Sequence, residues 1–531
     1  MVAGDLRTKR NIILACIFII AIFLRLAMSM YYFDISGDKI YQTAAAQSLV
    51  NGKGYTVPSV DPLNLDRVTD KPMILWPPMY SVLLAGLMKL DIQTSTASFI
   101  LDAINNIIFL ILIYQICVLL NFPFWLSMLV LLFKATEINE IITSSTATDY
   151  MGLNLWLAAI ITAISFLKKP QFTTAAIFIL LNALTPWLRY ANIPLVLVLP
   201  FVMLIAGIWK KHRHTIQMSL VSAIIALAST AFLLYYNQSR SGTFFYVLET
   251  TKGFFPENLL HLPPIVWTSI INVNFPLTQI SLRTGIYYGD LNIALKITSA
   301  LLLIVLFVHV LRSSNWKMIR DRPNYFFLLA GVLSVATLGS LALLSITRGR
   351  NYQVDRLWTY IEDNRYMVFV TTTLMFYLLY EFIVRRKDKW IGHILVFLLI
   401  AETAHGIWVM AKRPLPMPGE ISYNSGSPRT KYLLLERNTE AIKNGKELVL
   451  IDEDYDLRGF AILNNISIMD DPTDLSRTNY RSGNNKRLFL RIITGHESLF
   501  KVFLSQPGVR EIARMEKAVF YELDILIFKD F

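Results

Sequence analysis

The sequence is poor in charged residues and in cysteine. Only 17% of its 531 residues are charged, against about 25% in soluble domains. The two cysteines, Cys16 and Cys117, lie within apolar segments, which excludes a fold built on disulfides. The seven histidines show no metal-ligand spacing, and the absence of a GxxxxGK(S/T) loop argues against ATP-driven transport.

Apolar residues are in excess and make up 54% of the chain. They gather into segments of about 20 residues, which suffices to cross a hydrocarbon core of about 30 Å as a helix. No small-residue cleavage site follows the first segment, so we expect it to stay as a helix. The sequence predicts an α-helical polytopic membrane protein with about eleven spans. The expected spans are 11–30, 97–120, 123–137, 150–167, 172–189, 191–208, 215–236, 291–311, 324–345, 366–384 and 391–411.

Lysine and arginine are concentrated in alternate connections between these spans. Because such residues are retained on the cytoplasmic side, we expect a cytoplasmic N-terminus and, with an odd number of spans, an extracytoplasmic C-terminus at the cell membrane. The same rule explains the net charge of +12 without a nucleic-acid partner. The basic connections are 1–10, 168–171, 209–214, 312–323 and 385–390.

Most residues outside the spans are therefore predicted on one face of the membrane. We expect a transmembrane module, 1–411, with outer loops at 31–96, 237–290 and 346–365. The tail, 412–531, has a different character, because it opens on a proline-rich linker and then alternates helical and strand-like segments. A helix over 427–444 and a buried strand over 447–451 predict a small extracytoplasmic α/β domain.

The first outer loop carries a carboxylate just beyond the first span. Asp38 precedes a short alanine-rich helix predicted from about Lys39 to Val50, and Asp34 lies four residues earlier. A carboxylate fixed near the membrane surface suits a general base acting on an acceptor hydroxyl or amine. The alternative is that Ser36 or Asp38 only caps this helix.

Carboxylates and arginines also lie at other outer ends of the predicted spans. Glu140 and Asp149 suit an acceptor site or a divalent-cation site, and the alternative for Asp149 is helix capping. Basic residues are disfavoured on the outer side, yet the sequence places three arginines there: Arg189, Arg348 and Arg365. Their guanidinium groups suit a lipid phosphate. Their alternative is ion pairing with Asp355, Glu362 or Asp363.

Polar residues within the spans fall on common helix faces. Asp102, Asn105 and Asn106 share one face of their span, and Glu402 and His405 share a face of the last one. Such residues face the interior of a helix bundle. For Glu402 and His405 we expect a packing role.

The outer motifs resemble those of the GT-C superfamily of integral membrane glycosyltransferases. The pattern is most similar to bacterial relatives of protein O-mannosyltransferases and to the aminoarabinose transferases of lipid A, and it runs from about residue 11 to 455. Asp38 stands alone where many relatives have Asp-Glu, so Asp34 stays an alternative base. The motifs are Asp38 with Tyr41, Gly52-x-Gly54-Tyr55, Pro77-Pro78-x-Tyr80, Thr148-Asp149-Tyr150, Leu188-Arg189-Tyr190-Ala191, Asn364-Arg365-Tyr366 and the segment from Ser427 to Asp452.

The resemblance implies an inverting transfer of a sugar from a polyprenyl-phosphate donor. Asp38 would deprotonate the acceptor, Arg189 and Arg365 would hold the lipid phosphate, and Lys71 would assist. Asp149 would shape the acceptor side or a cation site. A divalent cation is the one cofactor left open, and the sequence does not decide between a protein, a lipid and a glycan as the acceptor.

Two other functions are compatible with the composition. One is a transporter or flippase of lipid-linked saccharides, and the other is a non-catalytic assembly or sensor protein whose tail binds partners. A transporter should show inverted repeats and broken spans around a site at the midplane. This chain instead carries its polar residues at the outer ends of the spans, which favours the glycosyltransferase.

Overall fold

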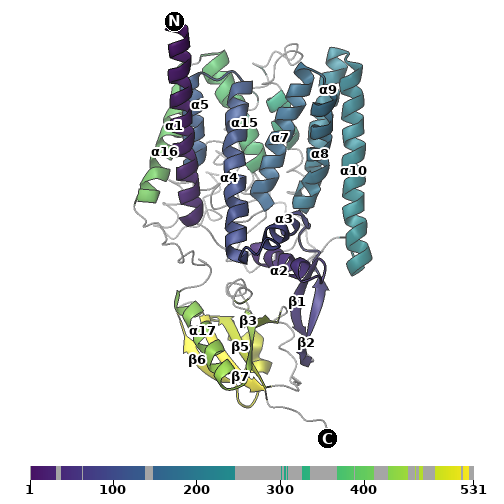
Figure 1. Ribbon diagram of the computed structural model, residues 1–531, viewed down its shortest axis with the longest axis vertical. Coiled ribbons are helices and arrows are strands. Elements are labelled where there is room, and N and C mark those ends of the chain that lie inside the picture. Colours follow the sequence, from purple (N-terminus) through teal and green to yellow (C-terminus); the bar gives the residue numbers. More distant parts are fainter. Residues whose placement is uncertain are drawn as a thin grey trace. The chain divides into compact units, whose positions relative to one another are not determined.

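Apolar helices dominate the structure, a computed structural model (Figure 1). It describes residues 2–31, 38–61, 64–137, 148–244, 301, 304–305, 308, 312, 326–334, 368–387, 389–411, 428–452, 461, 466–469, 485–515 and 518–525.

Among the described residues, seven helices are long and apolar enough to cross a membrane. The chain is an integral multi-pass membrane protein, as the sequence predicts. The seven candidates are Asn11–Met30, Thr94–Leu119, Thr148–Lys168, Tyr190–Lys210, Arg213–Ser241, Val368–Arg385 and Trp390–Trp408. The shorter apolar helices Phe124–Thr136 and Phe172–Leu188 coincide with two further expected spans. The expected spans 291–311 and 324–345 lie largely outside the described residues.

The chain divides into two compact units. Unit 1 contains Met1–Ser29, Ala103–Ser144 and Thr148–Leu415. Unit 2 contains Met30–Asp102, Ser145–Ala147 and Pro416–Phe531, so the first outer segment belongs to the same unit as the tail.

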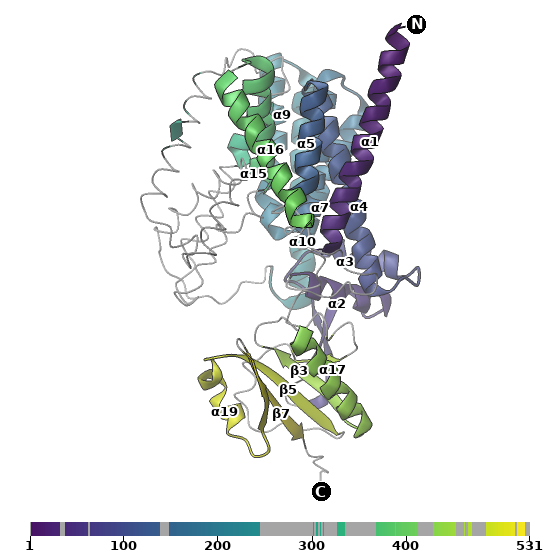
Figure 2. The same ribbon diagram turned by 90° about the vertical axis from the view of Figure 1, so that its left-hand side faces the viewer.

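Unit 1 is a helix bundle with one continuous apolar core, and its helices lie side by side in both views (Figures 1 and 2). Two expected spans are not uniform α-helices: one begins as the 3-10 helix η1, which contains Pro194, and another ends as the π-helix η6. The elements are α1 (Val2–Tyr31), α4 (Thr94–Leu119), α5 (Phe124–Thr136), α7 (Thr148–Lys168), α8 (Phe172–Leu188), η1 (Tyr190–Leu197), α9 (Val198–Lys210), α10 (Arg213–Ser241), α15 (Val368–Leu379), η6 (Tyr380–Arg385) and α16 (Lys389–Ala411).

Small residues let neighbouring helices of this bundle approach closely. A Cβ added to Gly406 of α16 would lie 2.8 Å from Cβ of Thr136 in α5. A Cβ added to Gly152 of α7 would lie 2.9 Å from Nδ2 of Asn192 in η1. In membranes such close backbone contacts are a main source of helix association, because lipid removes the hydrophobic advantage of burying apolar side chains.

Unit 2 contains two short helices, a hairpin and a mixed sheet. Strands β1 and β2 pair antiparallel, and the five-stranded sheet has the order β4-β3-β5-β7-β6. Strand β3 is parallel to β4 and β5, whereas β7 is antiparallel to β5 and β6. The elements are α2 (Asp38–Val50), β1 (Thr56–Asp61), β2 (Asn64–Pro72), α3 (Met79–Met88), α17 (Pro428–Lys443), β3 (Glu447–Asp452), β4 (Ser467–Ile468), β5 (Lys486–Ile493), η8 (Glu497–Phe500), α19 (Lys501–Leu504), β6 (Arg510–Arg514) and β7 (Ala518–Ile525).

The five-stranded sheet is covered on both faces. Leu434 and Ala441 of α17 pack with Phe489 and Phe520 on one face. Val60 and Leu65 from the β1–β2 hairpin join a second apolar cluster, with residues such as Leu488 and Val519, on the other face. The alternation of the two sets along β5 and β7 follows from the two-residue period of a strand. The first outer loop thus supplies part of the core of the tail domain.

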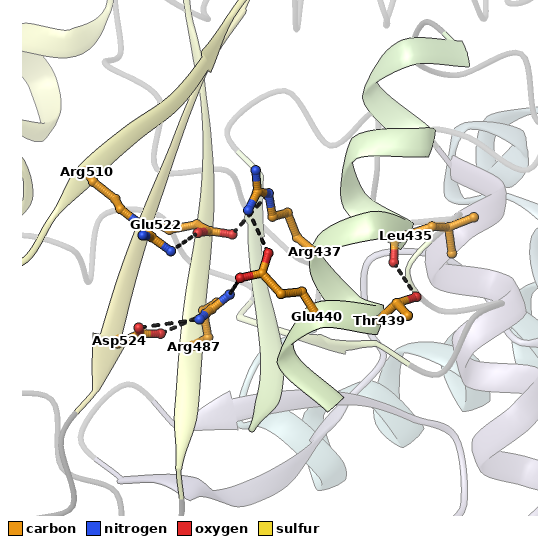
Figure 3. Close-up of polar contacts among 8 residues, drawn as sticks. All are labelled: Leu435, Arg437, Thr439, Glu440, Arg487, Arg510, Glu522 and Asp524. Carbon is orange, nitrogen blue, oxygen red and sulfur yellow. Dashed lines mark hydrogen bonds and ion pairs between the residues drawn. The ribbon is translucent and has the colours of Figure 1, made fainter. Parts of the chain in front are cut away.

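A line of alternating charges connects α17 with β5 and β7 (Figure 3). Arg437 contacts Glu440 at 2.7 Å and the buried Glu522 at 3.7 Å. Arg487 contacts Glu440 at 3.2 Å and Asp524 at 2.7 Å. Each buried charge therefore has an opposite charge beside it, which burial of ionised groups requires.

Candidate functional site

The structure describes four of the residues predicted for the site. Asp38 is the first residue of α2, and Asp149 lies in the first turn of α7. Arg189 lies between α8 and η1, and Lys71 is exposed on β2. The predicted residues Asp34, Glu140, Arg348 and Arg365 lie outside the described residues.

Asp149 and Arg189 are brought together, although 40 residues separate them in the chain. A terminal nitrogen of Arg189 forms an ion pair with Oδ1 of Asp149, and the side chains are only 9% and 2% exposed. Asp149 also places its negative charge at the positive, N-terminal end of the α7 dipole, which stabilises that charge. The partner of Arg189 is thus Asp149 of the neighbouring helix, whereas the sequence analysis named Asp355, Glu362 and Asp363 as possible partners.

Further polar groups are buried in unit 1. Asn154, five residues after Asp149 in α7, donates from Nδ2 to the backbone oxygen of Asn105 at 2.9 Å. Asn192, one turn after Arg189, donates to the backbone oxygen of Thr185 at 3.4 Å. Ten buried polar residues of unit 1 are referred to below as the buried polar layer: Arg25, Ser29, Asn105, Asn106, Lys134, Glu137, Asp149, Asn154, Arg189 and Asn192.

Arg25 of α1 is a member of this layer that the sequence reasoning missed. Its side chain is fully buried, with Nε donating to Oδ1 of Asn106 at 2.8 Å and Nη1 donating to the backbone oxygen of Lys134 at 3.0 Å. The guanidinium also lies over the rings of Phe109 and Tyr150, at 5.3 and 4.9 Å from their centroids. The available signal was a single charge within the apolar span 11–30.

Lys134 and Glu137 form a second buried ion pair at the end of α5. Nζ of Lys134 lies 2.6 Å from Oε2 of Glu137, and their side chains are 3% and 7% exposed. The structure thus gives Glu137 a local partner three residues earlier in the chain. This carboxylate therefore balances a lysine and serves the packing of the layer.

In unit 2, the first turn of α2 is fixed on several sides. Lys39, which follows Asp38, is fully buried and forms an ion pair with Asp102 of α4. Ser81 of α3 donates from Oγ to the backbone oxygen of Gln42 at 2.8 Å. The ring of Tyr41 stacks on Trp76 with 5.6 Å between ring centroids. These contacts hold the helix that begins at Asp38 in place. A residue that acts on a substrate has to be carried by such a fixed element.

Tyr80 supports the same region from α3. Its hydroxyl contacts Oγ of Ser98 at 3.1 Å, and the side chain is fully buried. Burial, with a smaller contribution from the negative charge of Asp102, raises the pKa of Tyr80 well above its ordinary value. The phenol therefore stays protonated and acts here as a hydrogen-bonding group of the scaffold.

Metal ligation finds no support in the part of the chain that the structure describes. Within it, no three His, Cys, Asp or Glu side chains come together as a candidate metal site. The carboxylates of Asp102, Glu137 and Asp149 have the basic partners Lys39, Lys134 and Arg189, respectively.

The architecture is similar to that of solved membrane-protein structures. A crystal structure of ArnT from Cupriavidus metallidurans bound to undecaprenyl phosphate aligns over 96% of this chain and 97% of its own, with a TM-score of 0.50 and 11% identity. The chain has the ArnT fold. The apo structure of the same protein aligns over 98% of both chains, with a TM-score of 0.44 and 12% identity. No family model and no curated protein sequence matches the chain.

The shared fold confirms the architecture expected from the GT-C resemblance. It extends over the helix bundle and the tail domain, since nearly all of both chains aligns. At 11% identity it assigns no residue a role. The chemistry therefore has to be argued from the groups that this chain itself brings together.

Proposed function

We propose that this protein is a glycosyltransferase that moves a sugar from a polyprenyl-phosphate-linked donor to an extracytoplasmic acceptor. The observation that carries the proposal is the end-to-end likeness to an ArnT structure that is bound to undecaprenyl phosphate. The buried ion pair of Asp149 and Arg189 supports it, because a guanidinium oriented by a carboxylate is a preorganised partner for a phosphate.

In the proposed reaction, Asp38 takes the proton of the acceptor hydroxyl or amine. The acceptor atom then attacks the anomeric carbon from the face opposite to the phosphate, so the configuration inverts. The bond from this carbon to the phosphate oxygen breaks, and its electron pair stays on the lipid phosphate, which leaves. A positioned general base contributes about 10²–10⁴-fold to such a step.

Basic groups stabilise the negative charge that develops on the leaving lipid phosphate. Arg189 is the first of these in the proposal, with Lys71, Arg348 and Arg365 as further contacts. The acids Asp34, Glu140 and Asp149 are proposed on the side of the acceptor or of a divalent cation. Charges that are oriented before the reaction stabilise a transition state without a further cost of reorganisation.

The proposal includes a location for each part of the chain. Residues 1–411 form the transmembrane catalytic module, with outer loops 31–96, 237–290 and 346–365. Residues 412–531 form an extracytoplasmic domain, and the N-terminus is cytoplasmic at the cell membrane. The alternation of basic connections supports this arrangement.

The test uses the full-length protein in proteoliposomes that contain a polyprenyl-phosphate sugar labelled in the sugar. We expect Asp38→Asn to lower the rate of transfer to the acceptor by about 100-fold or more, since it removes the base. Asp34→Asn changes the alternative base of the same loop and should lower the rate of transfer less than Asp38→Asn does. Full activity of Asp38→Asn with loss in Asp34→Asn would reassign the base, and full activity of both would rule out an acid of this loop.

A further inference from the structure

Arg25 differs from every other buried charge that the structure describes in unit 1. Glu137 pairs with Lys134, Asp149 with Arg189, and Glu381 with Arg385 and Arg386. Among the described residues, no carboxylate forms an ion pair with Arg25. Its contacts are two neutral oxygens and two aromatic rings. A buried charge without a counter-charge is strongly unfavourable, so the absence calls for an explanation.

The guanidinium of Arg25 also has a nitrogen without an acceptor. Nη2 is buried and makes no hydrogen bond in the described structure, whereas Nε and Nη1 each donate one. The buried polar layer therefore holds three cations, Arg25, Lys134 and Arg189, and two carboxylates, Glu137 and Asp149.

The position of Arg25 in α1 indicates which kind of anion could bind its guanidinium. It lies six residues before the end of α1, which corresponds to about 9 Å of helix, so the group sits near one end of the predicted span. Its neighbours Asn106, Phe109 and Tyr150 hold the planar group by a hydrogen bond and by both ring contacts. Lipid phosphates lie near the ends of membrane spans, and phosphate oxygens suit the fork of a guanidinium.

We propose that Arg25 is a binding site for a lipid phosphate, whose oxygen accepts from Nη2 and whose negative charge balances the third cation of the layer. The inference rests on the proposed function for the identity of that lipid, the polyprenyl phosphate. The phosphate of an ordinary phospholipid headgroup has the same chemistry, and the experiment distinguishes the two.

Asn106→Asp provides the sharpest test. The change keeps the volume of the side chain and puts a carboxylate where Oδ1 of Asn106 now accepts from Arg25 at 2.8 Å. Ser29, which accepts from Asn106 at 2.8 Å, can turn its hydroxyl to donate instead. The variant therefore neutralises Arg25 without opening a cavity, and it should melt at or above the wild-type temperature.

The measurement is binding of radiolabelled undecaprenyl phosphate, and separately of phosphatidylglycerol, to the full-length protein in detergent without acceptor. We expect Asn106→Asp and Arg25→Gln to weaken binding by about tenfold or more, the effect of losing one charge-assisted hydrogen bond. Two exposed positions serve as controls: Asn121→Asp makes the same charge change between α4 and α5, and Arg240→Gln removes an arginine at the end of α10. Both controls should bind as wild type.

Weakening for undecaprenyl phosphate alone assigns the site to the polyprenyl carrier, and equal weakening for both lipids assigns it to phosphate headgroups in general. Unchanged affinity of Asn106→Asp for both lipids overturns the proposal, and this variant decides the matter even if Arg25→Gln does not fold. No sugar is transferred in this measurement. A wild-type protein that binds the lipid but transfers nothing would contradict the proposed function and leave the Arg25 site intact.

Discussion

At the scale of single residues, the ion pair of Asp149 and Arg189 is the contact on which the proposed site depends. Its two side chains are almost entirely removed from solvent, so neither charge is compensated by water. Breaking a buried pair by removing one partner costs about 3–5 kcal/mol, whereas replacing both partners by apolar groups is often neutral. Replacing both partners should therefore affect the stability of the protein much less than its function.

We expect Asp149→Asn and Arg189→Gln each to lower the stability of the protein by about 3–5 kcal/mol. The double variant Asp149→Leu/Arg189→Met should recover most of this loss and still lack transfer activity, because it removes the arginine proposed to contact the phosphate. Thermal melting in detergent and the transfer assay, run on all three variants, measure the two effects. Losses of stability that simply add in the double variant would show that the two residues are not coupled.

The line of charges in the tail domain makes the stability of this domain depend on pH. The hydrogen bond from Arg487 is the largest influence on Glu440 and lowers its pKa from 4.5. Burial opposes ionisation of Asp524, but hydrogen bonds from Arg487 and Lys446 outweigh it and lower this pKa from 3.8. Carboxyl groups with lowered pKa values in the folded state stabilise it above their ordinary pKa values, and this contribution is lost as the pH falls through the lowered values.

We therefore expect the tail domain to keep its full stability above about pH 5 and to lose stability below about pH 4. Amide exchange of β5 and β7 in the full-length protein, corrected for the intrinsic rate at each pH, measures this. Arg487→Gln removes the partner of both carboxyl groups and should make the domain less stable at neutral pH and less sensitive to acid. An acid response that is the same in Arg487→Gln and wild type would contradict this assignment.

At the scale of elements, α2 is the helix that matters most, because it begins at Asp38. Its attachment through the Lys39–Asp102 pair is buried, whereas the Lys53–Asp70 pair just beyond it is open to solvent, with side chains 47% and 32% exposed. Exposed pairs contribute about 0–1 kcal/mol, far less than the loss caused by breaking a buried pair. The two pairs form a natural comparison, because each contains a lysine of the first outer loop.

We expect Lys39→Met to increase the amide exchange of α2 and to lower the transfer rate more than the affinity for donor. Lys39→Met/Asp102→Leu should restore much of the protection of α2, because it removes the uncompensated charge. The control Lys53→Met should leave both quantities within about twofold of wild type. If Lys39→Met and Lys53→Met behave alike, the buried pair does not hold α2.

The elements show how far local sequence patterns reach. Hydrophobic segments predicted most of the described helices, and the helix expected at 427–444 is found at Pro428–Lys443. The strand expected at 447–451 is found at Glu447–Asp452, for the same reason of local pattern. The β1–β2 hairpin was not predicted, because its nine-residue second strand, Asn64–Pro72, carries mostly polar residues that resemble a loop.

The candidate site was predictable only in part. Asp149 and Arg189 could be named as candidates from the sequence, because they are charged residues at the outer ends of apolar spans. Their mutual pairing was not, since it depends on how α7 packs against α8 and η1, and the sequence offered three other acids. The partners of Arg25 lie 81 and 109 residues away in the chain, so no local pattern identifies them.

At the scale of the whole molecule, the proposed orientation predicts which residues water-soluble reagents can reach. In a Cys16→Ser/Cys117→Ser background, Lys443→Cys in the tail should react with a membrane-impermeant maleimide in intact cells. Lys210→Cys, at the end of α9, should react only after the membrane is opened. The reverse pattern would place the tail in the cytoplasm and remove the acceptor side that the proposal requires.

The central claim is that the protein breaks the bond between a sugar and a polyprenyl phosphate, and does not merely carry the lipid across the membrane. The most direct test follows a polyprenyl-phosphate sugar, with separate labels in sugar and lipid, in proteoliposomes of the wild-type protein with envelope extract as acceptor. The account predicts release of free polyprenyl phosphate in step with the appearance of the sugar on a second molecule. Intact donor that reaches the opposite leaflet, with no polyprenyl phosphate released, would contradict it.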